Sequence, residues 1–159
     1  MYTMRWLLPI YLLILASSAN AATTVTLVSG SFSRTVAVSD LETLAVSGEA
    51  QNLDVIFAGG AFNKESLQKA LISKLQLSVI DADNVFNSKM GRKILAELSE
   101  GLRPTAASTQ DIAIKALRSA LVQSCEDDGA ATLIEVLKYY PTGSIVVDIS
   151  KLKGIIPKK

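Results

Sequence analysis

The chain has 159 residues, of which 49% are hydrophobic, and its formal net charge is +1. The 16 Lys and Arg residues are balanced by 15 Asp and Glu residues, which excludes a strong electrostatic field for DNA, RNA or an anionic membrane. There is no histidine, so a Ser-His-Asp site, a Cys-His site and every histidine-ligated metal site are excluded. The one cysteine, Cys125, excludes an intramolecular disulfide. We expect it to be a small buried hydrophobic residue; the alternative is a reactive or intermolecularly paired thiol.

Residues 1–21 have the three parts of a secretory signal peptide. Arg5 supplies the positive start, the apolar run Trp6–Ala16 the core, and Ala19-Asn20-Ala21 the cleavage site. The apolar run is shorter than the roughly 20 residues that a membrane-spanning helix needs. We expect cleavage after Ala21, export to the periplasm, the thylakoid lumen or the medium, and a single domain over 22–159. The alternative is an uncleaved N-terminal anchor.

The first elements after this segment are predicted to be a hairpin and a short helix. The β-branched runs 25–28 and 35–38 flank Ser29-Gly30-Ser31, which is typical of a β-hairpin. Ser39 and Glu42 have the spacing of a capping box, which predicts a helix over 40–46 that ends at Gly48. The stretch 51–61 is compatible with either a short helix or an extended segment.

Further amphipathic segments each follow a residue that can cap a helix. Apolar residues recur along them at helical spacing and are expected to face the core. Pro104 is expected to begin a loop. The predicted helices, with their caps, are 64–73 (Asn63), a short helix from Asp81, 89–99 (Ser88), 112–124 (Ser108 with Asp111) and 130–140 (Asp127 or Asp128). The residues expected to face inward include Leu67, Ala70, Leu71, Leu75, Val85, Phe86, Met90, Ile94, Leu95, Leu98 and Ile112.

Residues 144–149 alternate between apolar and polar positions, which predicts a half-buried strand. We expect this strand to join the N-terminal hairpin, because a two-stranded ribbon alone is only marginally stable. The predicted fold class is therefore α+β and mostly helical, with about five or six short helices on a small sheet made of the N-terminal hairpin and the C-terminal strand.

Short motifs follow these elements in a characteristic order. They are Gly30-Ser31-Phe32-Ser33-Arg34 before Val38-Ser39-Asp40-Leu41-Glu42 and Gly48, then Val85-Phe86-Asn87-Ser88 with Met90-Gly91-Arg92-Lys93-Ile94-Leu95, then Leu117-Arg118 with Ala120-Leu121, and finally Leu133-Ile134-Glu135-Val136-Leu137-Lys138-Tyr139-Tyr140-Pro141 with Ser144-Ile145.

With these motifs the chain resembles a cyanobacterial family known as domain of unknown function fourteen-hundred, over residues 25–149. One departure is Ser31, where the family tends to have proline. The resemblance implies a domain that, in many members, follows a signal peptide and precedes an alpha/beta-hydrolase domain. This chain stops at Lys159, where that domain would begin, so we expect the hydrolase label not to transfer. The family pattern assigns no catalytic residue within this domain.

The motifs for hydrolytic chemistry are incomplete. The sequence Gly30-Ser31-Phe32-Ser33-Arg34 does not match the nucleophile-elbow pattern G-x-S-x-G, since Phe32 stands at its third position and Arg34 at its last. A serine–lysine dyad has the spacing S-x-x-K, which occurs at Ser66–Lys69 and Ser150–Lys153. Neither S-D-N nor K-T-G accompanies these matches, so solvent-exposed helix surface is the preferred interpretation.

Other polar clusters also have simpler interpretations. The segment Asp81–Asn84 begins like a calcium loop, but Phe86 and Arg92 stand where that loop needs glycine and glutamate. Glu126-Asp127-Asp128 could bind a metal ion, but we expect it to cap a helix, and the pair Glu97 and Glu100 could be catalytic carboxylates, but we expect it to lie on the surface. The segment Gly59-Gly60 could bind an anion, but we expect a plain turn. Tyr139 and Tyr140 could line a binding surface, but we expect one of them to cover the core.

No catalytic, cofactor-binding or metal-binding residue is therefore predicted. The leading hypothesis is an exported, non-catalytic interaction domain that docks on or regulates a separately encoded alpha/beta-hydrolase, by analogy with the family's domain order. One alternative is a carrier of a small apolar, lipid-like ligand. The other is a hydrolase in its own right that uses a serine–lysine pair.

Overall fold

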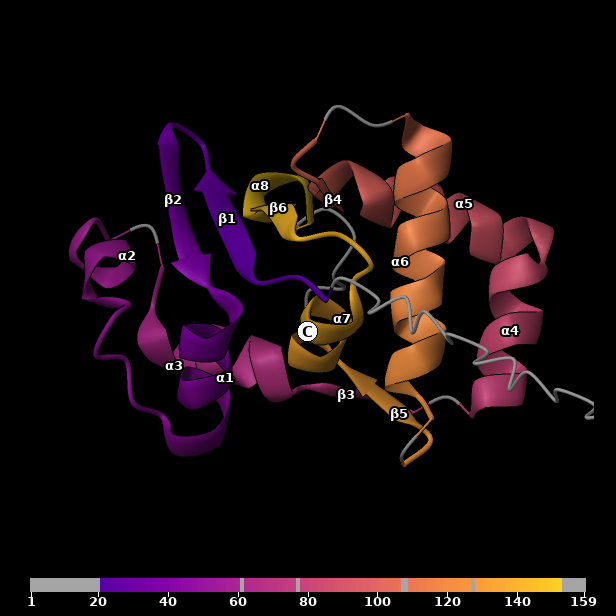
Figure 1. Cartoon of the computed structure of the whole chain (residues 1–159), viewed down its shortest axis with the longest axis horizontal. Coiled ribbons are helices and arrows are strands. Elements are labelled where there is room, and N and C mark those ends of the chain that lie inside the picture. Colours follow the sequence, from indigo (N-terminus) through magenta and orange to yellow (C-terminus); the bar gives the residue numbers. More distant parts are fainter. Residues whose placement is uncertain (1–20, 61, 77, 107–108, 127, 153–159) are drawn as a thin grey trace, which may run out of the picture.

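The computed structural model describes residues 21–60, 62–76, 78–106, 109–126 and 128–152. These residues form an α+β fold in which helices predominate (Figure 1). The helices are α1 (Val38–Ser47), α2 (Asp54–Ala58), α3 (Lys64–Ile72), α4 (Val79–Asn87), α5 (Lys89–Gly101), α6 (Gln110–Ser124), α7 (Leu133–Tyr139) and α8 (Ile149–Leu152). The strands are β1 (Thr24–Ser29), β2 (Phe32–Ala37), β3 (Lys74–Gln76), β4 (Leu102–Pro104), β5 (Ala130–Thr132) and β6 (Ser144–Asp148). The predicted signal peptide lies outside the described residues except for Ala21.

The main sheet has the strand order β2-β1-β6-β4. The hairpin β1–β2 is antiparallel, as its Ser-Gly-Ser turn predicts, and Gly30 at that turn has a φ of 60°. Strand β6 pairs with β1 in parallel and with β4 antiparallel. The predicted union of the hairpin with the C-terminal strand is confirmed, and β4 adds a fourth strand.

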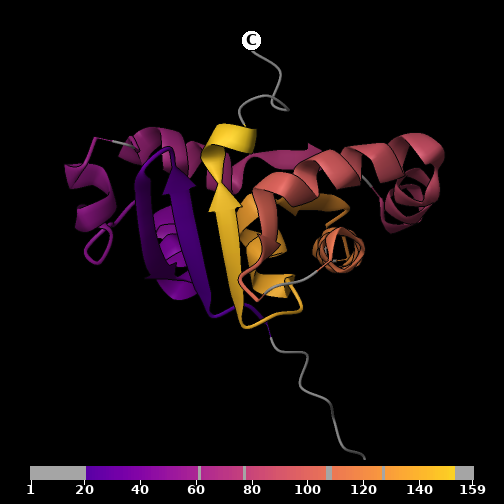
Figure 2. The same cartoon turned by 90° about the horizontal axis from the view of Figure 1, so that it is seen from above.

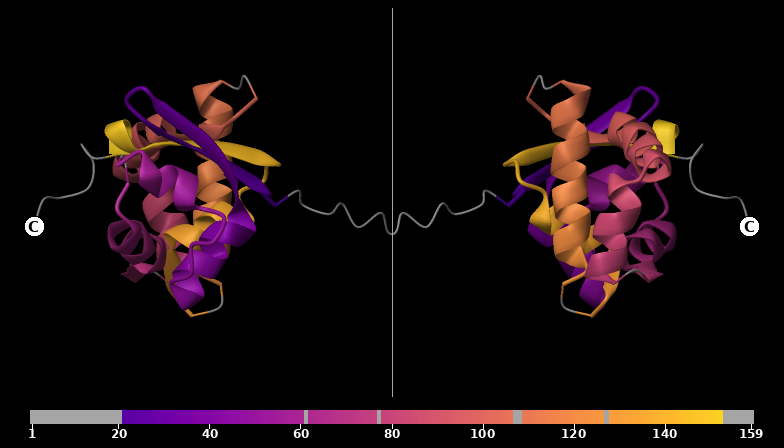
Figure 3. Two further views of the ribbon diagram at one scale, coloured as in Figure 1. Left: turned by 90° about the vertical axis from the view of Figure 1, so that its left-hand side faces the viewer. Right: turned by 90° about the vertical axis from the view of Figure 1, so that its right-hand side faces the viewer.

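One face of this sheet is packed against the core. Val25 and Leu27 of β1 lie beside Ile145 and Val147 of β6, and all four side chains are at most 3% exposed. The alternation of buried and half-buried residues along β1 and β6 follows from the period of two in a strand. Figure 3 shows the sheet along one side of the molecule, with most of the helices on the other.

A single hydrophobic cluster links the sheet to the helices. Its fully buried members come from elements spread over the whole described chain, and burying them supplies most of the driving force for folding. The largest are Tyr140, Leu41, Leu44, Leu53, Ile56, Leu71, Leu95, Leu137 and Ile145.

Three short strands lie where no strand is predicted from the sequence. Strand β4 includes Pro104, which was expected to begin a loop; as an edge strand β4 tolerates a residue without an N–H. Strands β3 and β5 pair antiparallel as a separate ribbon, so the predicted helix 130–140 begins only at Leu133. Ile149 opens α8 instead of ending the last strand.

The caps of four helices differ from those predicted. Ala37, not Ser39, precedes α1, and the carboxylate of Glu42 binds the Lys138 ammonium at 2.6 Å. This contact between α1 and α7 raises the pKa of Lys138 through a hydrogen bond and charge attraction. Ser78 caps α4 in place of Asp81.

Helix α7 is capped by Thr132 in a capping box with Glu135, in place of Asp127, which lies outside the described residues, or Asp128. Helix α6 starts after Thr109 with no side-chain cap, and the predicted cap Ser108 lies outside the described residues. The caps predicted for α3 and α5, Asn63 and Ser88, are confirmed.

Several apolar residues predicted to face inward are exposed instead. The buried stripe of these helices is narrower than their apolar pattern. Leu67, Leu71, Phe86 and Leu95 are buried as predicted, and Leu98 is half-buried. Those that are exposed are Ala70, Leu75, Val85, Met90, Ile94 and Ile112.

The corner between α4 and α5 depends on a close approach at Gly91. A β-carbon added at this residue would lie 1.9 Å from the Val85 carbonyl oxygen and 2.8 Å from the Phe86 α-carbon. Only glycine therefore fits at this point, since a β-carbon cannot lie this close to other atoms. The corner places α4 beside α6, and Figure 2 shows α6 end-on with α4 and α5 next to it.

Candidate functional site

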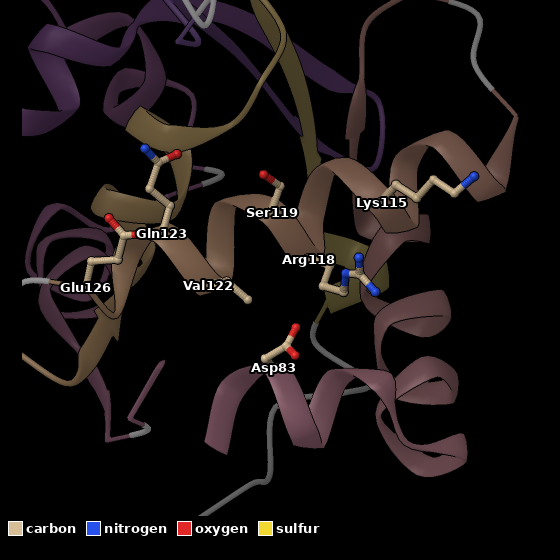
Figure 4. Close-up of a pocket in the computed structure, with 7 residues that line it drawn as sticks. All are labelled: Asp83, Lys115, Arg118, Ser119, Val122, Gln123 and Glu126. Atoms are coloured by element: carbon tan, nitrogen blue, oxygen red, sulfur yellow. The ribbon is translucent and has the colours of Figure 1, made fainter. Parts of the chain in front are cut away.

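A cleft of about 290 Å³ lies between α4 and α6, away from the hydrophobic core. Helix α6 buries Ala113, Ala116, Leu117, Ala120 and Leu121 on one face and presents polar side chains on the other. Figure 4 shows how the lining residues lie on the two helices. They are Asp83 from α4 together with Lys115, Arg118, Ser119, Val122, Gln123 and Glu126 from α6 and the residues just after it.

Asp83 and Arg118 carry opposite charges on the two walls of this cleft. Asp83 extends from α4 toward α6, and the Arg118 side chain extends toward α4 (Figure 4). No ion pair joins them among the described residues; Asn87 lies between them instead. Its amide nitrogen donates to Asp83 Oδ1 at 3.0 Å, and its amide oxygen accepts from the Arg118 guanidinium at 2.5 Å. The two charges are thus held apart by a neutral amide.

The two ends of the cleft differ in charge. At one end the Lys115 ammonium binds Asp111, one turn earlier in α6, at 2.7 Å. At the other end stands Glu126, just beyond the C-terminus of α6, where a negative charge interacts unfavourably with the helix dipole. The position of Glu126 is therefore not explained by the stability of α6.

The cleft contains one hydroxyl, that of Ser119, and no hydrogen bond joins it to a charged side chain in the described residues. Ser119 lies one turn after Lys115, and the ammonium of that lysine binds a carboxylate instead of the hydroxyl. A hydroxyl is a weak nucleophile at its own pKa and needs an adjacent base. The charged and amide side chains of the lining suit the recognition of charged groups.

Of the two S-x-x-K matches, only Ser66–Lys69 lies wholly within the described residues, and it forms no hydrogen-bonded pair there. Ser66 is exposed on α3, and no hydrogen bond connects its hydroxyl with Lys69. The Ser150 hydroxyl donates to Asp148 Oδ1 at 2.5 Å, and this bond lowers the pKa of Asp148, which makes its carboxylate a weak base. Lys153 lies outside the described residues.

The acidic clusters have structural partners. Asp81 accepts a hydrogen bond from the Ser78 hydroxyl, and its segment is helical rather than a loop. Asp128 binds Lys74 at 2.5 Å, and this bond lowers the pKa of Asp128 and raises that of Lys74. No group of three or more potential metal ligands occurs among the described residues. Glu97 and Glu100 are both exposed on α5.

The glycine turn and the second tyrosine take part in packing. Gly59 lies against the Phe32 ring, 3.1 Å from where a β-carbon would be, so this turn faces an aromatic side chain. Tyr140 is fully buried, and its hydroxyl has no hydrogen-bond partner in the described residues. Burial raises the pKa of Tyr140 to about 12. Tyr139 is half-buried.

Cys125 is 1% exposed, as expected for a small hydrophobic residue. Burial raises the pKa of its thiol, which disfavours the reactive thiolate.

Sequence patterns alone did not reveal the cleft. Its signal was present in α6, where polar residues recur three or four positions apart opposite the small-residue face. The sequence does not show that α4 packs beside α6. The proximity of Asp83 to α6 depends on the tight α4–α5 corner at Gly91.

Comparison with known proteins gives one match. A family model described as alpha/beta hydrolase of unknown function (DUF1400) matches residues 21–148. No curated protein and no solved structure matches the chain. In the part of the chain that the structure describes, no helix has the length and apolar character to cross a membrane.

Proposed function

Because the chain belongs to the family described as alpha/beta hydrolase of unknown function (DUF1400), we propose that it is an exported, non-catalytic interaction domain that docks on or regulates an alpha/beta-hydrolase. The observation that carries this proposal is the charged lining of the cleft, which suits the recognition of a polar partner. The chain has no histidine, and the one lysine in the cleft is engaged by a carboxylate. A functional claim must be argued from a site, and the lining of this site suits recognition.

The architecture supports the same conclusion. The hydrolase nucleophile sits on a sharp strand-to-helix turn with the pattern G-x-S-x-G. The sequence contains no such pattern, and the main sheet is small, with parallel and antiparallel pairs. The family's association with hydrolases therefore fits a role beside an enzyme better than a role as one.

The chemistry of the cleft also bears on the ligand-carrier alternative. Val122 is the one apolar residue in its lining, and the others are charged, amide or hydroxyl side chains. A lipid-like ligand binds in predominantly apolar pockets. The cleft thus favours a polar, charged partner.

Export belongs to the same proposal, and it rests on residues 1–21. The test is N-terminal sequencing of the chain recovered from its own source after cell fractionation. We expect the protein outside the cytoplasmic membrane, with Ala22 as its first residue. Recovery from the cytoplasm with the segment before Ala22 intact would contradict export.

A rate assay tests the non-catalytic role. The purified chain is incubated with short-chain nitrophenyl esters, alone and together with exported alpha/beta-hydrolases of the same cell. We expect the chain alone to give no hydrolysis above the buffer, and to bind one hydrolase or change its rate. Ester hydrolysis by the chain alone, abolished in Ser66→Ala or Ser119→Ala, would overturn the proposal.

A further inference from the structure

We propose that the cleft between α4 and α6 is the surface that contacts the partner protein, and that it takes a segment carrying an acidic side chain opposite Arg118 and a basic side chain opposite Glu126. This inference rests on the proposed function, and it adds the location and the chemistry of the contact.

The first step of the argument is the separation of charge across the cleft. Asp83 and Arg118 face each other, yet Asn87 keeps them from pairing. The guanidinium has five N–H donors, and one of them is used by Asn87. The remaining donors form a planar fork that suits a carboxylate from outside the chain.

The second step is the order of charges along α6. Arg118 lies within α6 and Glu126 follows eight residues later, just beyond the C-terminus of that helix, so the two charges stand apart along the cleft. Between them lie Val122 and Gln123, a short apolar and amide stretch. A segment with charges of the opposite order complements this surface, and the wrong orientation would place like charges together.

The third step is size. A volume of about 290 Å³ is at the lower limit of pockets that enclose small molecules. It admits one or two side chains and cannot enclose a whole helix or strand. The fitting occupant is therefore a protein surface that inserts side chains into the cleft, with its backbone outside.

The test places a photo-crosslinking amino acid at Ser119, which is exposed in the cleft, in the full chain carrying a C-terminal tag. A second chain carries the same group at Lys93, which is exposed on α5 outside the cleft. Both are produced in the protein's own source and illuminated, and the crosslinked peptides are identified by mass spectrometry. The capture at Ser119 is then repeated with Arg118→Gln and with Glu126→Gln.

We expect Ser119 to capture a protein segment that carries both an acidic and a basic residue, and Arg118→Gln to reduce the yield about tenfold, since an unpaired charge would remain in the contact. Capture of a hydrolase at Lys93 but not at Ser119 would overturn the cleft assignment and leave the proposed function standing. Arg118-dependent capture of such a segment from a protein other than a hydrolase would support the cleft and contradict the proposed function. If neither position captures a protein, the cleft assignment fails.

Discussion

At the residue scale, the structure depends on a few positions where adding or removing one atom would change the packing. Gly91 belongs to one of the motifs by which the chain resembles its family. From the sequence alone, a glycine inside a helix indicates only that the helix is locally weakened. The need for glycine there comes from the Val85 carbonyl of the neighbouring helix. Burial of Cys125 and Tyr140 is easier to foresee, because both end apolar helical stripes. Which hydroxyl lacks a partner depends on the tertiary surroundings, and no local pattern encodes it.

Gly91→Ala is expected to destabilise the domain strongly. The added methyl group would overlap the Val85 carbonyl oxygen, so the α4–α5 corner must open. We expect a loss of at least about 3 kcal/mol in the free energy of unfolding, the upper end of what overpacking usually costs. Chemical denaturation measures it. The matched control is Gly143→Ala, where a β-carbon has no neighbour within 4 Å, and a change of more than about 0.5 kcal/mol there would undermine the comparison.

Tyr140→Phe is expected to stabilise the domain. It removes a buried hydroxyl that has no hydrogen-bond partner among the described residues, while it keeps the aromatic ring in the core. Leaving such a group unsatisfied costs about 1–3 kcal/mol, so the variant should gain about 1 kcal/mol. Thermal and denaturant unfolding at pH 7 give the difference. A loss of similar size would show that the hydroxyl has a partner in the folded protein.

The same residue predicts a dependence on high pH. The pKa of Tyr140 is about 12 in the folded protein, above the value near 10 expected for the unfolded chain. Between these values the unfolded chain binds fewer protons, so the stability present below pH 10 falls as the pH rises toward 12. The wild-type protein should therefore lose stability over this window faster than Tyr140→Phe. Unfolding curves of both proteins at pH 9 and pH 11.5 measure this. An equal difference in the free energy of unfolding between the two proteins at both pH values would contradict the raised pKa of Tyr140.

At the scale of the elements, helices of about nine or more residues were predicted well and three-residue strands were not. Helices α3, α5 and α6 follow from apolar residues at helical spacing that repeat for two turns or more. Strands β3, β4 and β5 are too short to show the period of two, and their pairing depends on residues far away in the sequence. The capping box expected at Ser39 does not form, because α1 begins one residue earlier, at Val38. The Glu42 carboxylate binds Lys138 on α7, a partner that only the folded chain provides.

The cap of α7 gives a prediction at this scale. Thr132 accepts from the Glu135 backbone N–H, and the Glu135 carboxylate accepts from the Thr132 backbone N–H. Thr132→Ala is expected to cost about 1 kcal/mol, while Thr132→Ser retains the hydroxyl and most of the stability. Thr109→Ala is the control, since Thr109 precedes α6 without a side-chain cap. Equal losses in Thr132→Ala and Thr109→Ala would show that the capping bond is not the cause.

At the scale of the whole molecule, the fold class and the union of the hairpin with the last strand could be predicted, and the cleft could not. Hydrophobic patterns report which face of a helix is buried, whereas a cleft depends on how two helices meet. The α4–α5 corner determines how α4 lies against α6, and it brings Asp83 opposite Arg118. A surface with charges of both signs is suited to binding a protein, and this connects the architecture with the proposed role beside a hydrolase.

The most direct test of this account is an affinity capture of the full chain, tagged at its C-terminus, from an envelope extract of its own source, with the bound proteins identified by mass spectrometry. The account predicts enrichment of an alpha/beta-hydrolase over a tag-only control, and a loss of that enrichment in Arg118→Gln but not in Lys93→Gln. A capture without any hydrolase, repeated with crosslinking to retain weak partners, would contradict the central claim.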